Sequence, residues 1–277
     1  MQAPPRGVYL LGTMNDYSSL ISALNIFVYI TLFLIILEYL YSMHKKDGAY
    51  STPEMVGNFL NAIIMKFFLN NIGIMSYFGY LVLIKKQIPS LVTFTGQSFL
   101  AYVMCIVIID FTFYWYHRAQ HKFKLLWSMH FVHHSDDKLN LSTSYRMSLI
   151  EKMYLPIVML PAILLGFNPF FAIACYYMVS IYQFFNHGYY IKYPRILNKI
   201  LITPNIHRVH HQKAFDGMGK NFGVVLSLWD RMFGTYEEPS GPKDPGIIGY
   251  HQDDFIRMQI DPIVSYLRDL FKAFTRG

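Results

Sequence analysis

The feature that most constrains the fold is a long apolar stretch near the N-terminus, residues 20–41, with the sequence LISALNIFVYITLFLIILEYLY. At about 1.5 Å of rise per residue, a helix of this length crosses a hydrocarbon core of about 30 Å. Glu38 is its one acid and lies near its end. Only 15% of the chain is charged, whereas the share in a typical soluble domain is about 25%. We therefore expect an integral membrane protein, and residues 20–41 are its first predicted span.

Composition also excludes other classes of protein. The 22 Tyr and 23 Phe are the opposite of the low-hydrophobicity signature of disorder. The net charge of +7 does not require nucleic acid, because membrane proteins collect Lys and Arg on their cytoplasmic side. The two cysteines, Cys105 and Cys175, lie inside apolar runs and cannot build a disulfide framework or a thiolate metal site. We expect no nucleic-acid partner.

Three further apolar regions follow. Residues 59–84 contain one lysine and two asparagines, so they form one span or two half-helices, and we favour one span. Residues 98–116 form the next predicted span. Residues 149–185 are interrupted by Gly166, Asn168 and Pro169. Proline removes a backbone donor and disfavours helix before it, so this last region predicts a membrane hairpin over 149–186 rather than one long helix.

Charge distribution predicts the orientation. Residues 117–277 hold 18 of the 24 Lys and Arg and 12 of the 17 acids, so this half is expected on the cytoplasmic side. We predict one domain over residues 1–277, with N-terminal transmembrane helices in 1–116 and a histidine-rich catalytic region in 117–277. Residues 260–274 have an amphipathic pattern, which suits a helix lying on the membrane or packing on the cytosolic part.

Histidines carry the chemical signal. Nine of the 11 fall between residues 117 and 211, and His44 and His251, outside that interval, are interpreted as surface residues. The nine occur in HRAQH (His117, His121), HFVHH (His130, His133, His134), NHG (His187) and HRVHH (His207, His210, His211). A single HxxxH next to a membrane is more often a solvated face, and a histidine at a helix end can be a cap. Two HxxHH motifs together with HxxxH predict a metal site.

Spacing indicates how many metals are bound. Residues three or four apart share one face of a helix, so His117 and His121 can hold one ion. Adjacent residues such as His133 and His134 point about 100° apart, which suits two neighbouring ions. Eight or nine imidazoles also exceed the needs of one tetrahedral or octahedral ion. The fold class that we predict is therefore an all-α membrane protein with about four to five transmembrane or hairpin helices. A cytosolic helical cap holds its histidine-ligated dimetal site.

Location indicates the reaction better than ligand type does. Imidazole suits Zn, Cu, Fe or Ni, and no HExxH motif supports a zinc peptidase. A metal pair beside membrane helices is expected to act on lipids. The difficult reaction on a lipid is the oxidation of an unactivated C–H bond. Oxygen activation at two irons matches that task.

The motifs also resemble a known group of proteins. HxxxH followed by two HxxHH motifs between membrane helices resembles the fatty acid hydroxylase and sterol desaturase superfamily. FYWYHRAQH, WSMHFVHHSDDKLNLSTSYRMS, and TPNIHRVHH followed by NFGVVLSLWDRMFGTYE are similar to its alkylglycerol monooxygenase branch and bacterial relatives. The resemblance implies a cytosolic cap over a small helical stem, and a di-iron centre whose ligands are His117, His121, His130, His133, His134, His187, His207, His210 and His211. That branch uses tetrahydrobiopterin, although no pterin-binding motif is evident in the sequence.

Three acids are candidates for orienting the ligands. Asp110 lies in an otherwise apolar stretch, two helical turns before His117, and could accept a hydrogen bond from a ligand or serve helix packing. Asp136 and Asp137 follow HFVHH, and helix capping is their alternative role. Trp229 is expected to pack the cap onto the histidine-bearing helices.

The sequence therefore predicts an oxygen-dependent di-iron monooxygenase that acts on a membrane lipid. One candidate substrate is an alkyl ether lipid, which would be hydroxylated next to the ether oxygen. O2 is the cosubstrate. Electrons come from a separate redox partner or a reducing cosubstrate, because no flavin, haem or ferredoxin motif is present. Alternatives are a sterol, fatty-acyl or carotenoid hydroxylase or desaturase, a lipid-directed zinc hydrolase, and a non-catalytic metal-binding membrane protein. The sequence assigns no oligomeric state.

Overall fold

The structure is a computed structural model that describes residues 14–68, 79, 81, 83, 98–153, 156–213, 219–240, 245–248, 250 and 254–275. Over these residues the chain is helical, apart from two isolated β-bridges that join Leu201 to Leu226 and Gln212 to Pro245. The expectation of an all-α fold is confirmed for this part of the chain.

Ten α-helices and two short 3₁₀ helices make up the described part. They are α1 (Met14–Lys45), α2 (Thr52–Phe68), α4 (Phe99–Lys122), α5 (Lys124–His134), η3 (Leu141–Tyr145), α6 (Leu149–Met153), α7 (Pro156–Leu165), α8 (Pro169–Asn186), η4 (Arg195–Lys199), α9 (Pro204–His210), α10 (Leu228–Met232) and α11 (Phe255–Thr275).

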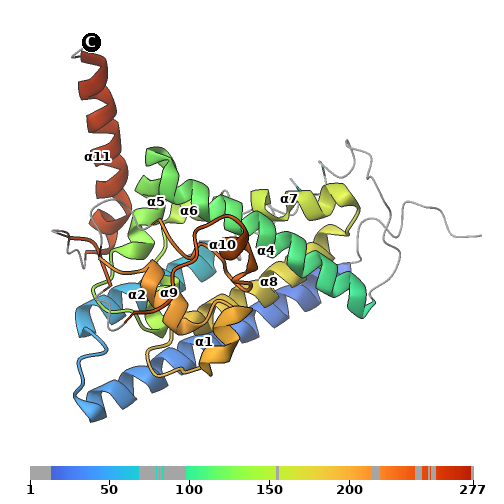
Figure 1. The fold of residues 1–277 in the computed structure, drawn as a ribbon, viewed down its shortest axis with the longest axis horizontal. Helices are drawn as coiled ribbons and strands as arrows, with labels where there is room; N and C mark the ends of the chain where they lie inside the picture. The colour runs from blue at the N-terminus through green and yellow to red at the C-terminus, as the bar shows by residue number, and fades with distance from the viewer. Residues whose placement is uncertain are drawn as a thin grey trace, which may run out of the picture.

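Two of these helices are long and apolar enough to cross a membrane. They are α1, over Asn25–Lys45, and α4, over Phe99–Lys122, judged by length and composition. Figure 1 shows both running along the long axis of the view, with their C-terminal ends toward the same side. Within the predicted span 59–84, α2 continues to Phe68, and most of the residues after it lie outside the described residues. The larger count of four to five membrane helices stays a prediction.

The predicted break in the fourth apolar region is confirmed. Helix α7 ends at Leu165, and Gly166 follows with a φ of 121°, a left-handed conformation that glycine adopts without strain. Asn168 then caps α8, because its side-chain oxygen accepts a hydrogen bond from the amide of Phe170 at 2.8 Å. Pro169 occupies the first helical position, where its missing N–H leaves no bond unmade.

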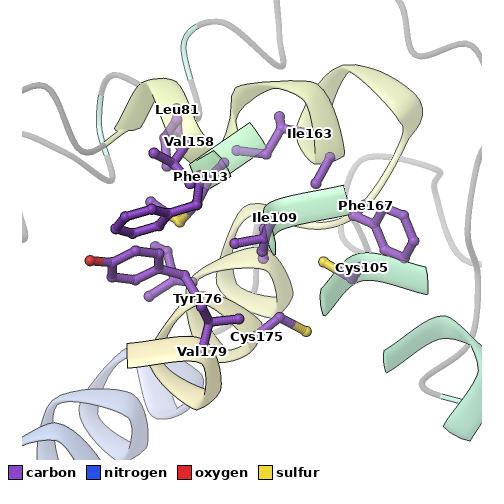
Figure 2. Close-up of a cluster of buried hydrophobic side chains, with 14 of the residues drawn as sticks. Leu81, Cys105, Ile109, Phe113, Val158, Ile163, Phe167, Cys175, Tyr176 and Val179 are labelled. Carbon is purple, nitrogen blue, oxygen red and sulfur yellow. The ribbon is translucent and has the colours of Figure 1, made fainter. Parts of the chain in front are cut away.

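An apolar core joins α4 to the hairpin. Figure 2 shows Ile109 and Phe113 of α4 beside Val158 of α7 and Tyr176 and Val179 of α8. All five side chains are buried. Inside a bilayer such packing is stabilised by van der Waals contacts between closely fitting side chains. This packing holds the C-terminal half of α4, which carries the first histidine motif, against the hairpin.

A single carboxylate attaches α1 to the loops around the histidines. Glu38 Oε2 accepts hydrogen bonds from the Tyr50 hydroxyl at 2.7 Å and the Leu141 amide at 2.8 Å, and Oε1 accepts from the Tyr189 amide at 2.8 Å. One α1 side chain therefore fixes the segments that follow HFVHH and NHG. In the sequence this residue stood out only as an acid near the end of an apolar stretch.

Candidate metal centre

All nine clustered histidines converge in space. The first group consists of His117, His121, His130, His134 and His210. The second group consists of His133, His187, His207 and His211. Within each group, one ring nitrogen per residue lies within 4.8 Å of those of the others. Of the two histidines outside the cluster, His44 is exposed, and His251 lies outside the described residues.

Helical spacing explains this division. The pairs four residues apart, such as His117 and His121 on α4, fall in the same group because they share a helix face. The adjacent residues His133 and His134 at the end of α5 fall in different groups, as the spacing predicts. His210 and His211 divide in the same way. Each HxxHH motif therefore contributes to both groups.

The Nε2 atoms of neighbouring histidines face one another. In the first group, His130 Nε2 lies 3.1 Å from His117 Nε2 and 3.2 Å from His134 Nε2. In the second, the separations are 3.2 Å between the Nε2 atoms of His187 and His133 and 3.1 Å between those of His207 and His187. These contacts bring nitrogens together from α4, α5, α8 and α9.

The hydrogen bond at Nδ1 of each ring determines whether its Nε2 atom carries a proton or a lone pair. The Nδ1 atoms of His117, His133 and His187 donate to the carbonyl oxygens of Phe222 at 2.9 Å, Arg146 at 3.1 Å and Gln183 at 2.9 Å. A neutral imidazole with its proton on Nδ1 has a lone pair on Nε2. Facing lone pairs repel unless a cation lies between them. The donor set therefore suits metal ions, and two groups suit two ions.

Burial keeps these imidazoles neutral. It lowers the pKa of His210 to about 3 and that of His187 to about 4. Burial, and then the proximity of His211, holds the pKa of His134 well below its usual range. At pH 7 these three rings are unprotonated, and a metal need not compete with protons for their lone pairs.

Glu151, which was not among the predicted site residues, contacts the centre directly. Its Oε1 accepts a hydrogen bond from Nδ1 of His130 at 3.2 Å and another from Nε2 of Gln120 at 2.7 Å. The carboxylate lies on α6 and is buried. The sequence did contain a signal for Glu151, because an acid within the apolar region 149–185 is as unusual as Asp110 within its own apolar stretch.

Asp136 and Asp137 follow the end of α5, which carries the first HxxHH motif, and they bond to groups other than the histidines. Asp136 Oδ2 accepts from Thr143 Oγ1 at 2.7 Å and Asn58 Nδ2 at 2.8 Å. Asp137 pairs with Lys213 at 3.0 Å. Asp136 also lies 3.8 Å from the guanidinium of Arg146, a buried arginine whose carbonyl oxygen receives the His133 bond. Asp136 thus reaches a histidine through Arg146.

Asp110 holds the segment after the last histidine motif against α4. Its Oδ1 accepts from the amide of Val225 at 2.8 Å, and its Oδ2 accepts from the amide of Leu226 at 3.1 Å and from Nε1 of Trp229 at 2.8 Å. Each of these donors lies between residues 225 and 229, after the last histidine motif. The packing role that the sequence left open for Asp110 accounts for these bonds, and Trp229 packs on α4 as expected.

A cavity adjoins both groups. Four histidines line it, two from each group: His117, His130, His133 and His187. Phe27 and Val28 of α1, Phe113 of α4 and Tyr176 of α8 also line it, together with Glu151. Since α1 is a candidate membrane span, the cavity connects the histidines with a helix that is long and apolar enough to contact lipid.

The family model for fatty acid hydroxylase matches residues 102–235, which include all nine histidines of the two groups. Over this region the chain is similar to the fatty acid hydroxylase family. Hydroxylases are oxidoreductases, so the prediction of an oxidoreductase is confirmed at the level of the family. The match also confirms the resemblance found in the motifs.

Several curated relatives of the family are similar to the chain. Alkylglycerol monooxygenase from Danio rerio is 39% identical over 132 residues, and its Homo sapiens counterpart is 36% identical over 129 residues. These matches cover 48% and 47% of this chain and 29% of each relative. An ornithine lipid hydroxylase from Rhizobium tropici is 29% identical over 165 residues, covering 58% of this chain and 49% of the relative. The chain thus spans less than a third of the length of these two alkylglycerol monooxygenases. No solved structure matches it.

Proposed function

We propose that the protein is an oxygen-dependent di-iron monooxygenase that hydroxylates a membrane lipid. The cavity that joins both histidine groups to α1 carries this proposal, because it offers an apolar lipid chain a path to the place where two metals would lie. The alkylglycerol monooxygenases and the ornithine lipid hydroxylase among the relatives support a lipid substrate. We favour an alkyl ether lipid, hydroxylated next to the ether oxygen.

The chain's own residues would prepare the reaction in two ways. Backbone carbonyls and Glu151 orient the imidazoles so that Nε2 atoms converge. Phe113 and Tyr176 give the cavity apolar walls, which exclude water and position a hydrocarbon chain beside the histidines. A pair of iron ions, when bound, would supply the oxidation of the C–H bond.

Hydroxylation requires a source of electrons. One atom of O2 enters the C–H bond, and the other leaves as water, so a reductant must supply the electrons and solvent the protons. We propose an external donor, either a redox protein or tetrahydrobiopterin. With an ether substrate, the hydroxylated product is a hemiacetal that separates into an aldehyde and an alcohol without further oxidant.

We further propose a multi-pass membrane location with the two histidine groups on the cytoplasmic side. The excess of Lys and Arg in residues 117–277 supports this orientation. Reporter fusions after residue 277 would be expected to report a cytoplasmic end. A reporter active only on the other side would contradict the orientation.

Oxygen consumption by the purified full chain tests the activity. The protein is loaded anaerobically with ferrous iron, given reductant, and offered an alkylglycerol, a fatty-acyl lipid or a sterol. We expect substrate-dependent oxygen uptake and, with ¹⁸O2, labelled product in mass spectrometry. His133→Ala, which removes a ligand of the second group, is expected to abolish uptake, whereas the exposed His44→Ala is expected to retain it.

The same assay separates the alternatives. Lipid turnover without oxygen or reductant would replace the proposal with a zinc hydrolase. Uptake on sterol or fatty-acyl lipid alone would keep the monooxygenase chemistry and change the substrate. Uptake that His133→Ala leaves unchanged would overturn the role of the histidines.

A further inference from the structure

Helix α11 exposes an apolar stripe that the other described residues do not cover. Six side chains, between 41% and 80% exposed, form it: Ile260, Val264, Leu267, Leu270, Phe271 and Phe274. Their spacing of three and four residues places them on one face of the helix. Contiguous exposed apolar surface of this kind marks an interaction site.

Among the described residues, it is the beginning of α11 that is anchored to the other helices. Met258 is 1% exposed, and the side chain of Gln259 bonds to the Met147 carbonyl at 3.0 Å and the Leu149 amide at 2.9 Å. Helix α11 packs against α5, and Figure 1 shows its later part projecting away from the other helices. The sequence left two roles open for this helix, lying on the membrane or packing on the cytosolic part. For the projecting half of α11, the structure does not favour the second role.

The direction of α11 indicates what the stripe contacts. Figure 1 shows it at the end of the molecule where α1 and α4 finish, running across their direction rather than along it. A helix that crosses two membrane spans at their ends runs along the bilayer surface. An amphipathic helix in that position buries its apolar face at the boundary between headgroups and acyl chains.

Charge at the stripe's edge fits the same partner. Arg257, Arg268 and Lys272 are exposed along one side of it, where they can reach lipid phosphates. Asp261 lies on the same side, between Arg268 and Lys272, and Asp269 lies opposite the stripe, on the face that would point to water. This side of the helix therefore carries a net positive charge, to which a surface of anionic phospholipid offers the opposite charge.

We propose that α11 lies on the phospholipid surface of the bilayer and inserts its stripe among the acyl chains. The test uses the full chain at one copy per nanodisc of phosphatidylcholine and phosphatidylglycerol. An environment-sensitive fluorophore is attached at Leu267→Cys on the stripe or at Ser265→Cys on the opposite face. Both native cysteines, Cys105 and Cys175, are buried, so the new thiol is the reactive one.

We expect brominated lipids to quench the probe at residue 267 several-fold more than the probe at 265, and iodide in solution to show the reverse preference. The pair Phe271→Cys and Asp269→Cys repeats the comparison one turn later. Equal iodide quenching on both faces, or no response of either stripe position to brominated lipid, would overturn the proposal. Single-copy discs exclude a second chain as the cause of protection, and no readout depends on activity or on metal.

Discussion

Glu151 Oε1 lies 3.2 Å from His130 Nδ1, while Nε2 of the same ring faces His117 and His134. The carboxylate accepts a hydrogen bond from the Nδ1–H group and so leaves the Nε2 lone pair for a metal, an arrangement that also raises ligand basicity. Glu151→Gln removes this charge at nearly constant volume. We expect metal affinity to fall by roughly 10–100-fold, measured by titration with ferrous iron and by metal content after dialysis.

The control for Glu151 is Ile150→Ala, a change at a 37% exposed neighbour on the same helix. It should retain the affinity of the parent protein. Equal affinity in the parent and Glu151→Gln would show that the hydrogen bond does not support His130 as a ligand.

Removing one ligand should separate the two metals. His207→Ala takes a nitrogen from the second group, whose Nε2 lies 3.1 Å from those of both His187 and His211. We expect about one metal ion per chain to be lost and the first group to keep its ion, because its donors are different residues. Mass-spectrometric metal analysis measures this. Full metal content in the variant would contradict the assignment of His207.

The segment around Phe222 leaves no room for a side chain at Gly223. A Cβ there would lie 2.6 Å from the Leu226 carbonyl oxygen and 2.9 Å from Asp230 Oδ2. We expect Gly223→Ala to shift this segment, displace the Phe222 carbonyl that receives the His117 bond, and lower both thermal stability and metal content. Gly219→Ala is the matched control, since its Cβ would meet nothing within 4 Å. Similar melting temperatures for the two variants would refute the steric argument.

Asp110 should matter for stability more than for chemistry. Asp110→Asn replaces one acceptor oxygen with a donor that faces amide and indole N–H groups. We expect a loss of about 1–3 kcal/mol in the free energy of unfolding, as for a buried charged acceptor that loses its bonds. Thermal or chemical unfolding in detergent measures it, with Val103→Ala on the exposed side of α4 as control. A variant as stable as the parent would contradict this role.

Filling the cavity should block the substrate without removing metal. Ser180 of α8 lines the cavity, and Met178, 50% exposed on the same helix, does not. We expect Ser180→Phe to lower lipid-dependent oxygen uptake strongly while metal content is retained, and Met178→Phe to leave both near the parent values. Unchanged uptake by Ser180→Phe would place the lipid elsewhere.

Local chemistry made part of this fold predictable. The break before α8 follows from Gly166, Asn168 and Pro169, whose backbone preferences act over a few residues. The division of His133 and His134 follows from helix periodicity alone. Each of these features depends on neighbours in the chain, which a sequence displays directly.

Contacts between distant residues could not be predicted in the same way. Asp110 meets Trp229 across 119 positions, and Asn58 meets Asp136 across 78. An acid in an apolar stretch indicates that a partner exists, but its identity depends on how the helices pack. Glu151 and Arg146 support the histidines through such contacts, and no spacing rule connects them to the motifs.

The division of adjacent histidines between the two groups has a mechanical consequence. A single peptide unit joins His133 to His134, and another joins His210 to His211, so rigid covalent geometry bridges the two groups twice. A displacement of one group is transmitted to the other through bonds that hardly stretch or bend. These two covalent links limit how far the groups can move apart, and inserting a residue at either junction would disturb both.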